Sequence, residues 1–249
     1  MNNPLIGKTA IITGASAGIG WAVAEDLAAA GAKVVVSARR KERLVALVKK
    51  IVAGGGSALA VEADAGDTGQ IDQLVKETLD WAGRLDIVVV NAGRGLAGGI
   101  LSSDQQQWES MYRLNVLGAA YLMRRAGEIL CQQGRGDIVV LGSVSGHHIS
   151  PFSGFYGSSK WAIAGAAEAM RREVCGKGVR VSIIKPGIVA SEFQAAAGYD
   201  AESFGAWVKR WGQPLNPADV ARAITFIVSQ PGYVHINEMV LRPAGQDYP

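Results

Sequence analysis

Short apolar runs alternate along the chain with longer stretches in which apolar residues recur every three or four positions. Apolar runs of about four to eight residues are typical of buried strands, and the longer period is typical of amphipathic helices. This alternation predicts an α/β domain with parallel strands. The predicted strands cover residues 8–12, 33–37, 57–62, 86–90, 137–141, 179–184 and 238–242, and the predicted helices cover 21–30, 41–53, 68–82, 103–133, 156–175 and 217–229.

A glycine-rich turn joins the first predicted strand to the first helix and contains Gly14, Gly18 and Gly20. Amide groups at the start of a helix point toward a bound anion, and the helix dipole favours negative charge there. Glycine also lets a pyrophosphate come close to the backbone. A strand, a glycine turn and a helix in this order therefore predict a phosphate site for a dinucleotide.

The end of the second strand bears on which dinucleotide binds. Dinucleotide folds commonly place an acidic residue there to hold the ribose 2′-hydroxyl. Ala38 occupies that place, and Arg39 and Arg40 follow it. Because guanidinium groups grip phosphate with paired hydrogen bonds, the two arginines favour a 2′-phosphate, as in NADP(H). A solvated basic turn that includes Lys41 and Arg43 is the alternative explanation.

Tyr156 and Lys160 stand at the head of a long alanine-rich helix. Residues four apart share one face of a helix, so the phenol and the ammonium are expected side by side. A neighbouring ammonium favours phenolate and lowers a phenol pKa that is ordinarily about 10. The spacing predicts a proton donor and acceptor; a surface helix that merely carries both residues is the alternative.

Several other polar residues lie at strand ends or inside apolar helices. Asp64 follows the third strand, Asn91 follows the fourth, and Arg94 lies on the glycine-rich loop beyond it. Ligands bind at the carboxyl edge of such sheets, so these residues are candidates for cofactor or substrate contacts. Asn115 stands among apolar residues of the predicted helix 103–133, where a buried amide needs partners. Its position alone favours a structural role.

Composition narrows the class of protein. The 249 residues are 49% hydrophobic and 19% charged, enough for one large domain with a core. The 25 basic and 22 acidic residues give a net charge of +3, which argues against a nucleic-acid partner or a membrane surface. Cys131 and Cys175 lack metal-ligand spacing, so no metal is expected. The N-terminus shows no signal-peptide pattern, so we expect a cytoplasmic protein.

The motifs taken together resemble a known family. They are Thr13-Gly14-xxx-Gly18-Ile19-Gly20, Asn91-Ala92-Gly93, Asn115, Ser143, Tyr156-xxx-Lys160 and Pro186-Gly187. Their order and spacing over about residues 8–243 resemble the short-chain dehydrogenase/reductase family in its single-domain branch. The resemblance implies a Rossmann-type, doubly wound parallel sheet of about seven strands, order 3-2-1-4-5-6-7. It implies one domain over 1–249, with a cofactor half at about 5–150, a catalytic and substrate half at about 136–249 and a lid at about 188–216.

The resemblance also assigns roles. Tyr156 would exchange a proton with the substrate oxygen, and Ser143 would hydrogen-bond that oxygen. Lys160 would hold the nicotinamide ribose and lower the Tyr156 pKa, and Asn115 would position a water in a proton relay. Ala17 departs from the basic residue of many NADP-dependent members. The candidate cofactor-binding residues are Gly14, Ser16, Gly18, Ile19, Gly20, Arg39, Arg40, Asp64, Ala65, Asn91, Ala92, Gly93, Tyr156, Lys160, Pro186, Gly187, Ile188 and Ser191.

A substrate lid is expected over residues 191–212. Phe204, Trp207 and Trp211 recur there at helical spacing, and one apolar stripe on a short helix needs a surface to cover. Permanent packing on the core or on a neighbouring subunit is the alternative. The candidate substrate residues are Arg94, Ser145, His147, Phe193 and Trp207.

The expected function is an NADP(H)-dependent oxidoreductase that interconverts a secondary alcohol or hydroxy acid and its carbonyl compound. The resemblance implies a small-molecule substrate and a homotetramer, with a dimer as the alternative. A second hypothesis is a 3-oxoacyl-carrier-protein reductase, although the tail 236–243 lacks the Asp-Gly-Gly turn usual in that group. A catalytically silent NADP-binding sensor or scaffold is a third. Under the second hypothesis, an acidic carrier would dock on Arg124, Arg125, Arg171 and Arg172.

Overall fold

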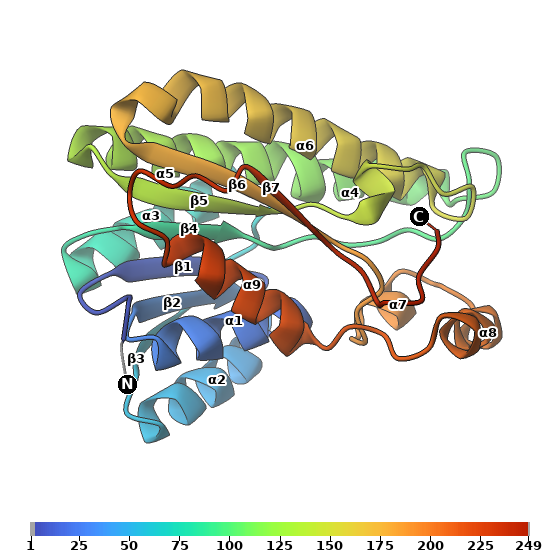
Figure 1. Cartoon of the computed structure of the whole chain (residues 1–249), viewed down its shortest axis with the longest axis horizontal. Coiled ribbons are helices and arrows are strands. Elements are labelled where there is room, and N and C mark those ends of the chain that lie inside the picture. Colours follow the sequence, from blue (N-terminus) through green and yellow to red (C-terminus); the bar gives the residue numbers. More distant parts are fainter. Residues whose placement is uncertain (1–2, 249) are drawn as a thin grey trace.

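A parallel β-sheet forms the centre of the structure (Figure 1). The computed structural model describes residues 3–248, and within these the seven strands lie in the order β3-β2-β1-β4-β5-β6-β7. Every neighbouring pair is parallel. The predicted fold class and strand order are therefore confirmed. The strands are β1 (Thr9–Thr13), β2 (Lys33–Ala38), β3 (Ser57–Glu62), β4 (Ile87–Val90), β5 (Gly136–Leu141), β6 (Val179–Pro186) and β7 (Glu238–Leu241).

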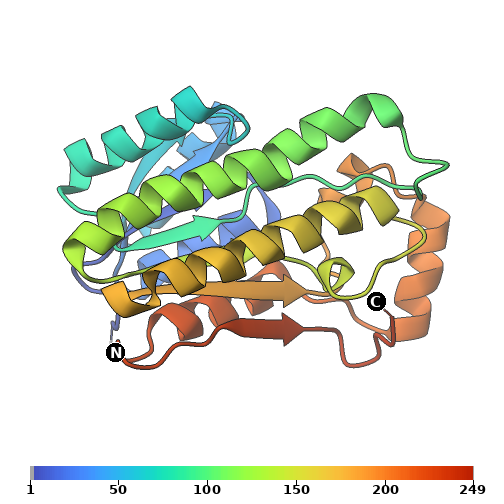
Figure 2. The same cartoon turned by 90° about the horizontal axis from the view of Figure 1, so that it is seen from above.

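Helices cover both faces of the sheet (Figures 1 and 2). Apolar side chains from three helices and one face of the strands form one core cluster, and three other helices complete a second cluster on the opposite face. Because both faces are covered, β1 and β4 are buried at every position. The first set is α1 (Gly18–Ala29), α2 (Lys41–Ala53) and α9 (Pro217–Val228), and the second is α3 (Thr68–Ala82), α5 (Ala119–Gln133) and α6 (Gly154–Val174).

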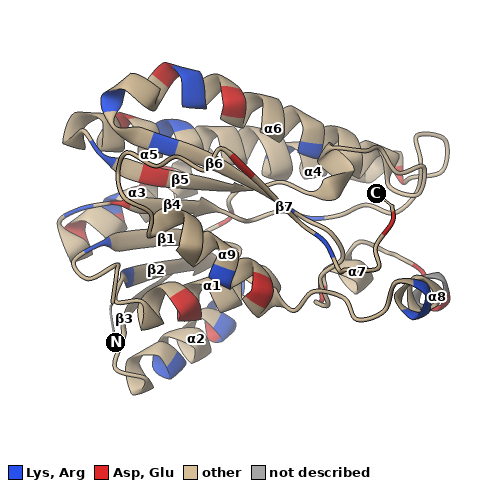
Figure 3. Cartoon of the chain, viewed as in Figure 1, with Lys and Arg blue, Asp and Glu red and all other residues tan. Residues whose placement is uncertain are grey.

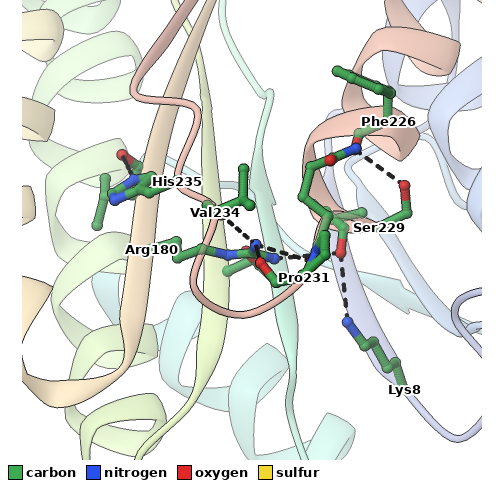
Figure 4. A network of polar contacts seen from close by, with 11 residues as sticks. Lys8, Arg180, Phe226, Ser229, Pro231, Val234 and His235 are labelled. Carbon is green, nitrogen blue, oxygen red and sulfur yellow. Dashed lines mark hydrogen bonds and ion pairs between the residues drawn. The ribbon is translucent and has the colours of Figure 1, made fainter.

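A network of buried polar groups joins the amino ends of β5 and β6 to the loop after α9 (Figure 4). Arg180 Nε donates to Asp137 Oδ1 at 2.7 Å, and its Nη1 donates to three backbone oxygens of that loop, of which Val234 O lies at 2.7 Å. Lys8 Nζ donates to Val228 O, the last residue of α9. Burial raises the pKa of Asp137, and the contact with Arg180 opposes that rise. The network fixes the path of the chain from α9 toward β7.

The predicted helix 103–133 is one element in the sequence pattern but several in the structure. After a short 3-10 turn, η1 (Gln105–Gln107), it runs as α4 (Trp108–Tyr112), a π-helical segment η2 (Arg113–Gly118) and α5. Gly118 ends the π-helical segment, and a Cβ there would lie 1.9 Å from Ala65 O, so only glycine fits at this position. The helix therefore packs directly against the loop that follows β3. Such π segments are rare and are frequent at functional sites.

The carboxyl ends of the strands face a group of short elements (Figures 1 and 2). These are η3 (Val144–Gly146), α7 (Phe193–Ala196) and α8 (Ala201–Trp211), while η4 (Cys175–Lys177) only ends α6. The segment expected to form a lid thus contains two helices where the sequence pattern predicted one short helix, and its role as a mobile lid stays a prediction. None of the described helices is long and apolar enough to cross a membrane.

Candidate active site

A cavity of about 830 Å³ opens at the carboxyl edge of the sheet. It brings together residues that lie at or just after the carboxyl ends of β1 to β6 and at the start of α6, which are far apart in the sequence. Nearly all of the predicted cofactor residues line it. They are Gly14, Ser16, Gly18, Ile19, Arg39, Arg40, Asp64, Ala65, Asn91, Ala92, Gly93, Tyr156, Lys160, Pro186, Gly187, Ile188 and Ser191.

The glycine-rich turn has the geometry that an anion site requires. Gly14 and Gly18 have φ values of +68° and +56°, which favour glycine, and a Cβ at Gly14 would lie 2.8 Å from Asn91 Nδ2. Ala17, which precedes α1, makes no side-chain hydrogen bond to the first turn of this helix. The amide groups of that turn therefore remain open to a ligand. Gly20 is buried and does not line the cavity; a Cβ there would lie 2.5 Å from Gly14 O. The turn therefore fits the pyrophosphate of a dinucleotide.

Tyr156, Ser143 and Lys160 meet at the inner end of the cavity. Ser143 follows β5, and its hydroxyl acts on the Tyr156 side chain, where it lowers the pKa of the phenol. Lys160 lies one turn further along α6, and its Nζ donates to Leu141 O at 2.8 Å and lies 5.9 Å from the centre of the Tyr156 ring. All three side chains are buried. The hydroxyls of Tyr156 and Ser143, with the Lys160 ammonium next to them, form an arrangement that can transfer a proton.

The expected lowering of the Tyr156 pKa is not met in this structure. Burial raises the pKa of Tyr156, Tyr199 raises it further, and the hydrogen bond from Ser143 offsets only part of the rise. Burial also lowers the pKa of Lys160 to about 8. The i, i+4 spacing does place Tyr156 and Lys160 together. The pKa expected from that spacing was wrong because folding removes both side chains from water, and this disfavours their charged forms.

Asn115 lies behind the cavity rather than in its wall. Its Oδ1 accepts from Arg94 N at 2.9 Å, and its Nδ2 donates to Arg94 O at 2.8 Å and to Ser159 Oγ at 3.1 Å. The buried amide is therefore satisfied, and it ties the loop after β4 to α6. A role in a water relay stays a prediction.

The basic residues after β2 are all engaged by acidic side chains. Arg40 also receives support from the glycine-rich turn, because its Nε and Nη2 both donate to Ser16 Oγ, at 3.0 and 2.9 Å. The turn after β2 therefore differs from one in which basic side chains face the solvent without acidic partners. The pairs are Arg39–Asp64 at 3.8 Å, Arg40–Glu192 at 2.9 Å, Lys41–Glu62 at 3.8 Å and Arg43–Glu192.

Four of the five candidate substrate residues line the cavity, namely Arg94, Ser145, Phe193 and Trp207. The prediction for His147 is not supported, because this residue lies outside the cavity wall. Its Nδ1 lies 3.8 Å from Glu238 Oε1. The tight turn of η3 keeps Ser145 inside and directs the following residues toward β7.

Sequence reasoning missed the C-terminal tail as part of the site. Gln246 Oε1 accepts from Ile188 N at 3.0 Å, Asp247 Oδ1 accepts from Trp211 Nε1 at 2.7 Å, and Tyr248 Oη donates to Ile149 O. The tail carries no periodic pattern, so nothing in the sequence placed it beside α8. The cavity wall also includes Phe152, Ser153, Glu192, Tyr199, Phe204 and Trp211.

Comparison with known proteins decides the family. The model of the short chain dehydrogenase family matches residues 8–202, which contain the glycine-rich turn and the Ser143, Tyr156 and Lys160 cluster. The chain belongs to the short-chain dehydrogenase/reductase family. As a member it is an oxidoreductase with a nicotinamide-binding fold.

Individual relatives show how far the likeness extends. An oxidoreductase of undefined activity from Staphylococcus saprophyticus is 31% identical, with 95% of this chain and 97% of that protein covered. A glycine betaine reductase from Emericella nidulans is 34% identical over 96% of this chain, but the chain spans only 19% of that protein. An alcohol dehydrogenase from Thermococcus sibiricus, solved with 5-hydroxy-NADP, is 26% identical, covers 97% of this chain and 99% of its own, and has a TM-score of 0.86.

Proposed function

We propose that this short-chain dehydrogenase/reductase uses NADP(H) to interconvert a secondary alcohol or hydroxy acid and its carbonyl compound. The observation that carries the proposal is the cluster of Tyr156, Ser143 and Lys160 in the cavity wall: all three side chains are buried, and Lys160 Nζ lies 5.9 Å from the centre of the Tyr156 ring. A cofactor-binding sensor would have no need of that cluster. The single domain over residues 1–249 belongs to the same proposal.

Each side chain of the cluster has its own role in the proposed reaction. The bound nicotinamide supplies or accepts the hydride. Tyr156 Oη donates a proton to the carbonyl oxygen in reduction and removes it in oxidation. Ser143 Oγ hydrogen-bonds the same oxygen and stabilises the negative charge that develops there. The Lys160 ammonium, held by Leu141 O, supplies positive charge next to the phenol.

The part of the cavity next to Tyr156 supports both substrate classes in the proposal. Its wall is aromatic: the Tyr156 and Phe193 rings lie 5.6 Å apart between centres, and the Phe152 and Trp207 rings also lie 5.6 Å apart. This surface suits an apolar substituent on the carbonyl carbon. Arg94 lines the same cavity and hydrogen-bonds the neutral groups of Gln107 and Ser110, so neither of these hydrogen bonds goes to a carboxylate and a substrate carboxylate could bind its guanidinium.

Docking of an acidic carrier protein has less support. Arg124 and Arg125 are bonded to Glu128, and Arg171 and Arg172 are bonded to Glu168. Each of these guanidinium groups already has a carboxylate partner, which reduces the attraction that the four arginines could offer to an acidic carrier. Figure 3 shows both signs of charge interspersed over the outer helices.

A homotetramer in the cytoplasm completes the proposal. Leu117 and Trp161 are large apolar side chains that are 64% and 49% exposed in the single chain, at η2 and α6. Burying such side chains between subunits removes them from water. Light scattering at micromolar concentration should give a mass near four chains, and a monomer would contradict this part of the proposal.

The function is tested with a panel of aldehydes, aryl and alkyl ketones and 2-oxo acids, each with NADPH and with NADH. We expect reduction of at least one carbonyl class, with a higher kcat/KM for NADPH. No turnover in either direction, together with tight NADPH binding, would instead favour a sensor.

A further inference from the structure

Glu192 links the two ends of the cofactor cavity. It lies between Ser191, which lines the nicotinamide end, and α7, which carries Phe193. Its carboxylate nevertheless reaches the adenosine end: Oε2 accepts from Arg40 Nη1 at 2.9 Å, and Oε1 accepts from Arg43 Nη1. These hydrogen bonds, that of Arg43 first, lower the pKa of Glu192, so the carboxylate is charged at neutral pH.

The other acidic partners of this basic cluster come from a different part of the chain. Asp64 and Glu62 lie at the end of β3, beside β2, and their closest contacts with Arg39 and Lys41 are 3.8 Å. Only the Glu192 contacts, among the described residues, join this cluster to the segment before α7. Both Glu192 and Arg40 are about half exposed, at 55% and 47%. A ligand can therefore reach and replace this contact without unfolding the core.

A 2′-phosphate and the Glu192 carboxylate would require the same donors. Two donors of Arg40 are already directed at Ser16 Oγ in the glycine-rich turn, which leaves Nη1 facing Glu192. A phosphate placed at this guanidinium would lie next to a like charge and would compete with Glu192 for the donors of Arg40 and Arg43. Each anion would therefore weaken the binding of the other there.

We propose that Glu192 is an internal competitor for the 2′-phosphate of the cofactor. In the cofactor-free protein it occupies Arg40 and Arg43 and holds residues 191–197 against α2. Binding of a 2′-phosphate displaces it and releases that segment. Because Phe193 follows directly and its ring packs 5.6 Å from the Tyr156 ring, the displacement also reaches the substrate pocket. This inference rests on the proposed use of NADP(H).

Adenosine 2′,5′-bisphosphate tests the competition without a nicotinamide, and 5′-AMP is the matched ligand without the 2′-phosphate. In calorimetric titrations we expect Glu192→Gln to bind the bisphosphate about threefold to fivefold more tightly than the wild type, as a partly exposed ion pair allows. The affinity for 5′-AMP should change less than about twofold. Glu62→Gln removes the same charge beside the same cluster, so a shift of equal size in that variant would overturn specific competition by Glu192.

Hydrogen exchange provides the second measurement. Adding the bisphosphate to the wild type should speed exchange in residues 191–197 relative to 5′-AMP, and in Glu192→Gln the two ligands should give the same exchange. Unchanged exchange in the wild type would overturn the displacement. If neither protein prefers the bisphosphate to 5′-AMP, the proposed NADP(H) preference fails; if both prefer it equally, only the role of Glu192 fails.

Discussion

Arg180 and Arg40 lie at opposite edges of the same sheet and have opposite surroundings. The Arg180 side chain is 10% exposed, and its partners are the buried Asp137 and backbone oxygens of the loop after α9. The Arg40 side chain is 47% exposed, and its partners are two side chains, Ser16 Oγ and the Glu192 carboxylate. Both arginines are hydrogen-bonded, but only the second has partners that a ligand can replace.

This difference between Arg180 and Arg40 shows which region of the protein supports its stability and which supports ligand binding and catalysis. Backbone oxygens and a buried carboxylate cannot move away from Arg180 unless the fold opens, and an unpaired buried charge is costly. At the carboxyl edge the polar groups line a cavity, so exchanging their partners leaves the core intact. We therefore expect changes at the carboxyl edge to alter binding and turnover, and changes at the amino edge to alter the free energy of unfolding.

The largest expected effect is at the carboxyl edge. Tyr156→Phe removes the proton donor and little volume, so kcat should fall by about 10²–10⁴-fold while the Kd for the cofactor stays nearly constant. Tyr233→Phe removes a hydroxyl from a tyrosine that is 90% exposed and lies outside the cavity wall, and it is the matched control. Steady-state kinetics and cofactor titration measure both. Retention of more than about a tenth of the wild-type turnover in Tyr156→Phe, with chemistry rate-limiting, would contradict the assignment.

Arg180→Met tests the amino edge. Loss of the guanidinium leaves Asp137 buried without its partner, so the free energy of unfolding should fall by about 3–5 kcal/mol, while kcat/KM of the folded protein is unchanged. Urea unfolding measures the fall. The double variant Arg180→Met with Asp137→Leu should recover part of the loss, because it removes the orphaned carboxylate. A loss below about 1 kcal/mol would contradict the structural role.

Lys160 sharpens the comparison, because it lies at the carboxyl edge but is buried like Arg180. Its pKa falls from 10.5 in the unfolded chain to about 8 in the folded one, so between these values the unfolded state binds more protons. Stability should therefore rise with pH above 8, by up to about 1.4 kcal/mol per unit. Urea unfolding at pH 7.5 to 9.5 measures the slope, which Lys160→Met should remove. Identical slopes in both proteins would show that Lys160 keeps its ordinary pKa.

The smallest expected effect concerns the choice of cofactor. The Arg39 side chain is 76% exposed and has only a distant carboxylate at 3.8 Å, so its loss should not affect folding. Arg39→Ala should raise the KM for NADPH about tenfold and the KM for NADH less than about twofold, since a phosphate contact is charge-assisted. Lys49→Ala, an exposed change on α2, is the control. Equal KM values for the two cofactors in the wild type would contradict the preference.

The sequence patterns alone predicted the seven strands and most of the helices, because these depend on short-range periodicity, and the family resemblance of the motifs predicted the strand order. Residues four apart on one helix must share a face, which placed Tyr156 beside Lys160. The glycine spacing determined the phosphate turn in the same way, through positive φ at Gly14 and Gly18.

Only the tertiary structure decided what surrounds these residues. The raised pKa of Tyr156 follows from burial, which depends on neighbours such as Tyr199 from another segment. Glu192 contacts Arg40 across 152 positions of the chain. Asp247 reaches Trp211 although the tail has no periodic pattern. Such contacts form when the folded core brings loops together, so no local spacing records them, and they determine which charged groups are fixed and which a ligand can displace.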